Sequence, residues 1–237
     1  MNIQEAIRAR HSVRRFLNQP IEEDIRAQLQ KEIDTSNTEG NLSIKLVCDE
    51  PKAFDSTLAH YGKFSGVQNY LMLAGPDSPT LSGRCGYYGE RIVLLAQQLG
   101  LNTCWVGLTF KKRFVRKALD TNSKLSVVVA LGYGTESGSE HPVKSLNEVC
   151  SISHEGEMPD WFKRGMDAAL LAPTAMNQQK FHIELTNNIS LDGKAIVGIK
   201  SKGGAYSDVD LGIVRLHFEL GAGTENFVWA DADSWKE

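Results

Sequence analysis

The chain has 237 residues, 41% of them hydrophobic, which is enough to bury the core of one large domain or two small ones. Its 26 basic residues are balanced by 29 acidic residues, and the net charge of -3 gives no general electrostatic reason to expect nucleic acid as a partner. No apolar run approaches the roughly 20 residues of a membrane span, and the first residues lack a signal peptide, so we expect a soluble, cytoplasmic protein with no membrane partner. The four cysteines lie far apart and match neither a zinc site nor a disulfide framework, so we expect buried thiols and no metal site.

The first two predicted elements are helices on either side of a basic cluster. Asn2 and Glu5 have the spacing of a capping box, which predicts a short helix that ends close to the sequence RARHSVRRF at residues 8–16. Pro20 is followed by acidic residues and by apolar residues at four-residue spacing, which predicts a second helix that stops near Asp34.

Strand patterns dominate the middle of the first half. Runs rich in β-branched and apolar residues predict strands at 44–48, 69–75 and 125–133, the last buried on both faces because its polarity does not alternate. Between the last two strands, residues 87–102 have the apolar face of a helix that Gly100 should stop. These patterns predict helices packed on a sheet.

The same kinds of element return after a Gly/Ser-rich stretch at 132–150, the best candidate for a connection between two halves. Residues 158–172 predict an amphipathic helix, 180–186 and 195–199 predict strands, and 208–223 predict a further helix. Both halves therefore contain the order helix, strand, strand, helix.

The last helices of the two halves also share residues. When 89–100 is set beside 210–221, an Ile-Val pair, a leucine two residues later and a final Leu-Gly coincide. Two amphipathic helices that meet the same packing needs could produce this likeness without common origin. The repeated order of elements favours an internal duplication, with 1–150 as the first repeat and 151–237 as a second, degenerate repeat.

The basic cluster contains a candidate anion site. Arg10, Ser12 and Arg14 alternate, so in an extended segment they point the same way and offer two guanidinium groups and a hydroxyl to one ligand, such as a phosphate monoester. The alternative is that these arginines only complement the dipole of the preceding helix and stay solvated.

A second candidate lies between the helix at 158–172 and the strand that follows it. Pro173 ends the helix, and Thr174, Asn177 and Gln179 form a polar loop that could hydrogen-bond a flat heterocycle. The same residues are also ordinary turn formers.

Two further signals are weak when each is taken alone. Trp105, just before a glycine, could form the wall of an aromatic site, although a tryptophan in that position is more often core. Lys144 lies in the connecting stretch, where a lysine is usually solvated, and the basic pattern at 110–119 favours a solvated helix over a nucleic-acid contact.

Taken together, these segments resemble the FMN-dependent nitroreductase family over most of the chain. RHSVRRF (10–16) matches an R-x-S-x-R-like segment with a phenylalanine beyond it, and APTAMNQQ (172–179) matches an A-P-S-A-x-N-x-Q-like loop, with Thr174 for serine. GLNTCWVG (100–107) and VVALGY (128–133) match a G-L-x-x-C-W-x-G-like segment and the buried strand after it. The resemblance implies an α+β, nitroreductase-like fold with a central, mainly antiparallel sheet flanked by helices.

One departure from the family pattern concerns the polar loop. The family has this loop soon after the basic segment, whereas here residues 33–47 occupy that place and the loop comes about 140 residues later. Family enzymes are dimers with FMN at the subunit interface, so the displaced loop implies a tandem-fused, pseudo-dimeric chain with one composite site. The chain itself would be a pseudo-dimeric monomer or a homodimer.

The resemblance also implies a function. It predicts an FMN-dependent NAD(P)H oxidoreductase that reduces nitroaromatics, quinones or similar small electron acceptors by ping-pong hydride transfer through the flavin, with no catalytic residue assigned. The alternatives are a non-enzymatic flavin-binding or storage module, since Lys180 and Phe181 replace the usual Pro-Trp, and a protein that has lost the cofactor. The implied cofactor-binding residues are Arg10, His11, Ser12, Arg14, Trp105, Val106, Gly107, Leu108, Lys144, Pro173, Thr174, Ala175, Asn177 and Gln179.

Overall fold

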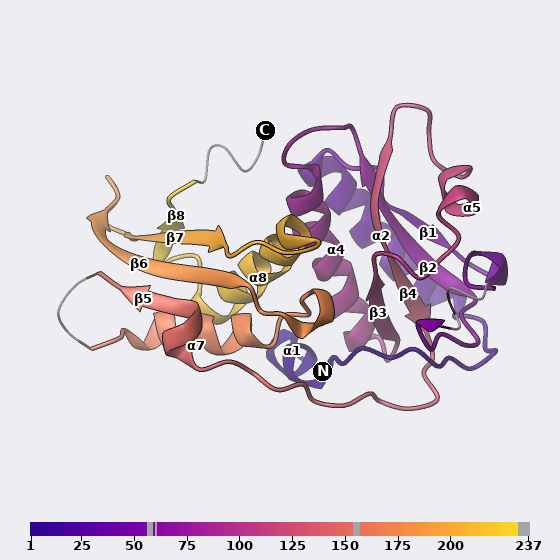
Figure 1. Cartoon of the computed structure of the whole chain (residues 1–237), viewed down its shortest axis with the longest axis horizontal. Coiled ribbons are helices and arrows are strands. Elements are labelled where there is room, and N and C mark those ends of the chain that lie inside the picture. The colour runs from indigo at the N-terminus through magenta and orange to yellow at the C-terminus, as the bar shows by residue number, and fades with distance from the viewer. Residues whose placement is uncertain (56–58, 60, 154–156, 232–237) are drawn as a thin grey trace. The chain divides into compact units, whose positions relative to one another are not determined.

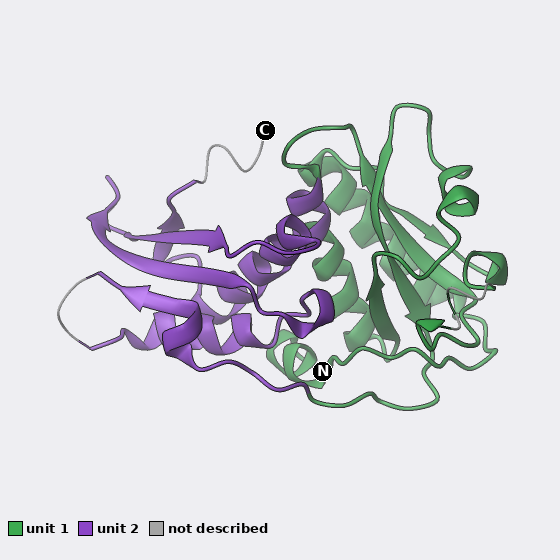
Figure 2. Cartoon of the chain, in the orientation of Figure 1, with its two compact units in different colours: residues 1–81, 88–140 green, residues 82–87, 141–237 purple. Residues whose placement is uncertain are grey.

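The computed structural model describes residues 1–55, 59, 61–153 and 157–231 (Figure 1). Figure 2 shows its two compact units. Unit 1 comprises Met1–Leu81 and Tyr88–Glu140, and unit 2 comprises Ser82–Tyr87 and His141–Glu237. This division reflects packing and leaves the predicted repeats at 1–150 and 151–237 as predictions; residues 154–156 and 232–237 of the second lie outside the described part of the chain.

The first helix of unit 1 begins where the sequence predicts, but the second ends later than predicted. The capping box of Asn2 and Glu5 is confirmed at the start of α1 (Ile3–Ala9). The next helix, α2 (Glu23–Gly40), runs six residues past the predicted stop near Asp34, because its polar last turns still pack and the left-handed Asn41 (φ 46°) ends it. The other helical segments of unit 1 are η1 (Pro51–Ala53), α4 (Leu81–Gln98) and α5 (Lys112–Arg116).

The sheet of unit 1 is antiparallel throughout and has the order β1-β2-β4-β3. Its strands are β1 (Lys45–Val47), β2 (Asn69–Gly75), β3 (Asn102–Val106) and β4 (Lys124–Gly132). Every residue of β2 is buried, and so are the last six of β4, which confirms the prediction of a strand covered on both faces. β3 was predicted only as the segment after a helix.

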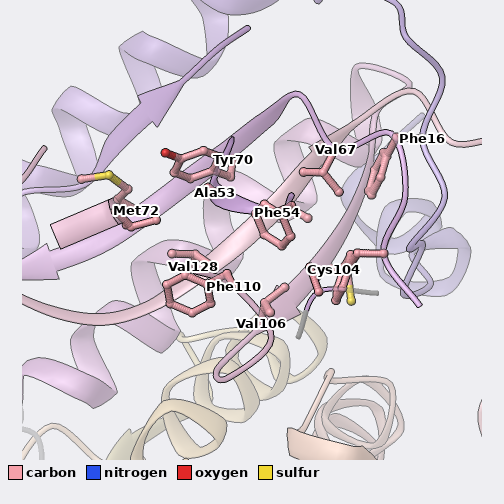
Figure 3. Packing of buried hydrophobic residues seen from close by; sticks show 14 of the residues in the cluster. Phe16, Ala53, Phe54, Val67, Tyr70, Met72, Cys104, Val106, Phe110 and Val128 are labelled. Atoms are coloured by element: carbon pink, nitrogen blue, oxygen red, sulfur yellow. The ribbon is translucent and has the colours of Figure 1, made fainter. Parts of the chain in front are cut away.

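A cluster of aromatic and aliphatic side chains covers one face of this sheet (Figure 3). The ring of Phe54 lies 5.3 Å from that of Phe64, 5.9 Å from Tyr70 and 6.4 Å from Phe110, measured between centroids. Cys104 of β3 also belongs to the cluster, so the edge strand is fixed from this side. α4 packs on the opposite face.

Unit 2 has a second four-stranded sheet, so the single central sheet of the prediction is two sheets. Its order is β5-β6-β7-β8; the central pair is antiparallel and the two outer pairs are parallel. The strands are β5 (Cys150–Ile152), β6 (Phe181–Ile189), β7 (Ala195–Ser201) and β8 (Phe227–Trp229), and the helical segments are α6 (Leu146–Val149), α7 (Asp160–Leu170), η2 (Ala175–Asn177) and α8 (Ser207–Ala222).

The core of unit 2 is aromatic. Phe218 of α8 lies 5.4 Å from Phe162 of α7, 5.1 Å from Phe227 and 5.3 Å from Trp229, measured between ring centroids. The predicted helices at 158–172 and 208–223 are thus confirmed, and their apolar faces join two helices to one face of the sheet.

None of the helices in the described residues is long and apolar enough to cross a membrane. All four cysteines are free thiols; Cys85, Cys104 and Cys150 are buried as predicted, and Cys48 is half-buried.

The first turns of α4 lie in unit 2 and pack against α8. The sequence predicted a start near residue 87, six residues too late, because Gly83 and Gly86 weaken the helical pattern. Both glycines serve close packing: a Cβ at Gly86 would overlap the carbonyl oxygen of Val209, and one at Gly212 would overlap that of Gly83. The two helices can approach this closely only without side chains at these positions.

We expect Gly212→Ala to lower the free energy of unfolding by roughly 2–3 kcal/mol, because the added methyl group overlaps backbone that cannot rotate away. Helix propensity alone predicts a gain of about 1 kcal/mol for the same change, so the sign decides between the two explanations. Urea denaturation measures it. Gly198→Ala is the control, since nothing lies within 4 Å of its Cβ position, and it should be neutral or slightly stabilising.

Candidate functional site

The segment after α1 runs along the edge strand of the unit 1 sheet. Ser12 forms a parallel bridge with Thr103 of β3, and the Val13 N–H donates to the Thr103 carbonyl at 3.0 Å. Val13 and Phe16 are buried in the core cluster, whereas Ser12 and Arg14 are exposed. The extended backbone therefore places the serine and the arginine on the open side of the segment.

Arg10 lies differently, because it caps the helix before the extended segment begins. Its N–H donates to the Ala6 carbonyl at 2.9 Å, and its side chain is only 2% exposed. The nearest counter-ion is Glu90 of α4, whose Oε1 lies 3.8 Å from Arg10 Nε, and burial lowers the pKa of the guanidinium while Glu90 opposes this shift. Within the described residues, neither Nε nor Nη1 of Arg10 has a hydrogen-bond acceptor.

All three residues of the basic motif nevertheless influence one group, the buried thiol of Cys104. Burial raises the pKa of this thiol, and three neighbours oppose the shift: the charge of Arg14, a side-chain hydrogen bond with Ser12, and the charge of Arg10. Two cations and a hydroxyl thus contribute to the electrostatics of this part of unit 1. Guanidinium groups and a hydroxyl are donors that suit an anionic ligand with several oxygens.

The other arginines of the cluster do not share this environment. Arg15 is exposed and forms a bidentate pair with Glu136, with 2.7 Å between Nη2 and Oε2. Arg8 is exposed on α1. A pair of this kind on the surface adds little to stability.

The segment from Trp105 to Leu108 closes the same edge of unit 1. The indole N–H of Trp105 donates to Glu90 Oε2 at 2.8 Å, and the ring is half-buried. Val106 is buried in the core cluster, and Gly107 is half-buried. Leu108 is 61% exposed.

In unit 2, the polar loop between α7 and β6 has an unusual backbone. Met176, Asn177 and Gln179 have φ values of 53°, 52° and 44°, a region that residues other than glycine rarely adopt. Backbone strain of this kind persists only where surrounding contacts hold it, and it concentrates at functional sites.

The Gln179 side chain supplies many of these contacts. It is 2% exposed; its Oε1 accepts from the Lys144 N–H at 2.9 Å, and its Nε2 donates to the Pro142 carbonyl and to Asn177 Oδ1, both at 2.8 Å. The Lys144 ammonium donates to the Gln179 carbonyl at 3.1 Å, and the Thr174 hydroxyl accepts from the Gln179 N–H at 3.0 Å. The structure thus brings together four predicted residues of unit 2.

A buried carboxylate fixes the other side of this loop. Asp210 of α8 accepts from the Ala175 N–H at 2.9 Å through Oδ1 and from Gln178 Nε2 at 3.0 Å through Oδ2. Burial raises the pKa of Asp210 to about 6, against the opposing effect of the hydrogen bonds from Gln178 and Ala175.

The sequence analysis did not single out Glu90 or Asp210. Glu90 lies in the middle of a helix and Asp210 in the first turn of one, where an acid is expected to complement the helix dipole, so neither position carries a signal of its own. Pro173 and His11 are half-buried beside their motifs. The predicted residues therefore form two groups, one in each unit.

Comparison with known families identifies the chain. The model of the family described as "Putative TM nitroreductase" matches residues 2–222. The chain belongs to this nitroreductase family. No curated protein matches it.

Solved structures show that this nitroreductase family member has a nitroreductase-like fold. A chain from Thermotoga maritima described as a "putative nitroreductase" is 22% identical, with a TM-score of 0.63; the alignment covers 93% of this chain and 83% of that one. A "putative nitroreductase in complex with FMN" from Desulfovibrio desulfuricans is 15% identical, with a TM-score of 0.52, over 67% of this chain and 99% of that one.

The carboxyl group of Asp210 should make the stability of this family member depend on pH. Because its pKa in the folded protein is raised, the stability that its protonated form contributes is fully present below about pH 3.8 and is lost as the pH rises through about 6. We expect the free energy of unfolding of the parent to fall relative to that of Asp210→Asn by on the order of 2–3 kcal/mol between pH 4 and pH 7. Denaturation of both proteins at a series of pH values measures this.

The matched control is Asp208→Asn, which removes an exposed acid from the same helical turn and should keep a constant difference from the parent. Parallel pH profiles for the parent and Asp210→Asn would contradict the assignment.

Proposed function

We propose that the chain is an FMN-dependent NAD(P)H oxidoreductase that reduces nitroaromatics, quinones or similar small acceptors. Membership of a nitroreductase family supports a flavin oxidoreductase, and the relative from D. desulfuricans is described as a complex with FMN. A soluble, cytoplasmic location stays a prediction, and the proposed reductant is either NADH or NADPH.

The observation that carries the proposal is the state of Arg10. Its buried guanidinium has two donor atoms without acceptors among the residues that the structure describes. Such unsatisfied buried donors are costly and rare in native structures. A phosphate monoester would supply the missing oxygens and the opposing charge. Ser12 and Arg14 are exposed on the segment that follows Arg10, so the residues present fit the phosphate of FMN.

Unit 2 would hold the flavin ring. The Thr174 hydroxyl retains its proton for donation while it accepts from Gln179, and the Lys144 ammonium has donors beyond the one used by the Gln179 carbonyl. Both remain able to bind a ligand. The amide of Gln179 is fully engaged inside unit 2, so we assign it to the shape of the loop rather than to contact with the ring.

When bound, FMN would supply the redox chemistry, namely hydride transfer from NADH or NADPH and electron transfer to a second substrate. The chain's own residues bind and orient. Arg10, Arg14 and Ser12 would fix the phosphate, the loop at 173–179 would present donors to the polar edge of the ring, and the backbone of 105–108 would lie near its back face. A cation or amide dipoles near the ring would stabilise negative charge on it.

We further propose that the chain arose by tandem fusion and holds one composite site. Each unit contains the order helix, strand, strand, helix, strand: α2-β1-β2-α4-β3 and α7-β6-β7-α8-β8. In each, the first two strands pair antiparallel, and the strand after the second helix runs parallel to the one before it. Among the strands that the structure describes, β4 lies between β2 and β3 and has no counterpart in unit 2, and β5, at the edge beside β6, has none in unit 1.

The connection between the first helix and the first strand differs between the units. In unit 1 it spans only residues 41–44 and is closed by Asn37, whose amide donates to the Ile44 carbonyl at 3.0 Å and accepts from the Ile44 N–H at 2.6 Å. In unit 2 it spans 171–180 and contains the polar loop. The basic segment in one unit and the polar loop in the other are the parts that one composite site needs.

Loss of the two motif arginines should abolish tight FMN binding. We expect Arg10→Ala combined with Arg14→Ala to lower the affinity for FMN on the order of 100-fold or more, since each charge-assisted hydrogen bond contributes about 1.5–3 kcal/mol. Affinity for riboflavin, which has no phosphate, should change much less. Fluorescence titration measures both.

Arg15→Ala is the control for this experiment, because Arg15 pairs with Glu136 on the surface and should leave FMN affinity unchanged. Retention of FMN at parental affinity by the folded double variant would falsify the phosphate assignment.

The enzyme and its alternatives give different absorption spectra. We expect the purified protein to take up FMN and its yellow colour to bleach when NADH or NADPH is added without oxygen, followed by recovery on addition of a quinone or nitroaromatic. A yellow protein inert to both nicotinamides would instead be a flavin-binding module, and a protein that takes up no FMN would have lost the cofactor.

A further inference from the structure

Glu90 connects two parts of the candidate site within unit 1. It lies on α4, and its side chain is fully buried at 0% exposure. One carboxylate oxygen, Oε2, accepts from the Trp105 indole at 2.8 Å, and the other, Oε1, lies 3.8 Å from Arg10 Nε. One buried acid therefore faces both the cation proposed to bind phosphate and the tryptophan that closes the same edge.

The two contacts differ in kind. The distance to Trp105 is that of a hydrogen bond, whereas 3.8 Å exceeds the range of about 2.7–3.2 Å for an N–H donor and an oxygen acceptor. Glu90 thus compensates the charge of Arg10 without occupying its donors, which agrees with the absence of acceptors for Arg10 Nε and Nη1 among the described residues. An added anion would find both the charge and the donors available.

We propose that Glu90 is the resident counter-ion of Arg10, which stabilises the guanidinium while no phosphate is bound and weakens the hold on a phosphate monoester when one binds. The inference rests on the proposed function, because it concerns the same site. A phosphate dianion beside Arg10 must share the cation with a carboxylate of like charge, and the low dielectric of a buried site strengthens that repulsion. Glu90 therefore sets how much of the affinity for FMN comes from its phosphate.

The variant Glu90→Gln separates the two contacts. Its amide oxygen can still accept from the Trp105 indole, so the tryptophan keeps its hydrogen bond, while the negative charge beside Arg10 is removed. We expect the free protein to become less stable, because a buried guanidinium loses its counter-ion. We expect the affinity for FMN to rise about tenfold or more and the affinity for riboflavin to stay unchanged.

Inorganic phosphate distinguishes the source of the anion. Measured at pH 8, where phosphate is largely dianionic, inorganic phosphate should raise the melting temperature of Glu90→Gln more than that of the parent. It should also compete with FMN and leave riboflavin binding unaffected. If inorganic phosphate competes with FMN but not with riboflavin, the site takes a phosphate from either source. If inorganic phosphate has no effect while Glu90→Gln still binds FMN more tightly, the phosphate must be attached to the flavin. Both results support the proposal.

Glu219→Gln is the matched control. Glu219 of α8 also accepts from a tryptophan indole, that of Trp229 at 2.7 Å, and from the Tyr87 hydroxyl at 2.5 Å. Neither Trp229 nor Tyr87 belongs to the candidate site, so this variant should bind FMN and riboflavin as the parent does. It reports any general effect of replacing a buried carboxylate that accepts from an indole.

The proposal is overturned if Glu90→Gln leaves the ratio of the FMN affinity to the riboflavin affinity unchanged, or lowers it. Glu90 would then act only on structure. If Glu90→Gln does not fold, Glu90→Asp withdraws the charge from Arg10 and should raise the ratio by a smaller factor; an unchanged ratio is again fatal. If the parent protein binds no flavin, the proposed function is refuted. The effect of inorganic phosphate on the melting temperatures of the parent and Glu90→Gln would still decide the role of Glu90.

Discussion

The charge of Arg10 has to be compensated inside the protein, and the arrangement of unit 1 follows from how this is done. Arg10 caps α1 with its backbone N–H and has a buried side chain, and the chain that follows is fixed at once by its pairing with Thr103. The compensating carboxylate comes from α4, and the same carboxylate binds the indole of β3. One ionised pair therefore joins α1, α4 and the edge strand. Burial of an unpaired charge costs several kcal/mol, so these elements are coupled.

Unit 2 also contains a buried ionisable group, but there it is an acid, Asp210, rather than a cation. Its polar loop contains three non-glycine residues with positive φ, and two buried side chains hold that conformation from opposite sides. Gln179 binds the loop to the chain around Pro142 and Lys144, while Asp210 binds it to the start of α8. The raised pKa of Asp210 is the cost of placing an acid there, and its two hydrogen bonds offset part of that cost. In each unit, the residues of the candidate site are held by a buried ionisable group.

The sequence predicted what periodicity and local chemistry determine. The box of Asn2 and Glu5 and the unbroken apolar run of β4 read directly as a helix start and a buried strand. The early turns of α4 were missed because their glycines look unfavourable until the backbone of α8 is in place beside them. Glu90 and Asp210 were missed for a related reason. A motif identifies residues that contact a ligand, but the residues that support them come from distant segments whose roles appear only when the chain has folded.

The proposed fusion accounts for the differences between the two units if each unit no longer has to supply every element of the site. Identical subunits of a dimer must each carry every element of the site, because each contributes to both copies of it. In a fused chain one unit can keep the basic segment and shorten its helix-to-strand connection to residues 41–44, and the other can keep the long loop at 171–180 and dispense with a counterpart of β4. The close contact of Gly83, Gly86 and Gly212 then acquires a role of its own. It ties the first turns of α4, whose remaining turns belong to unit 1, to the helix that carries Asp210.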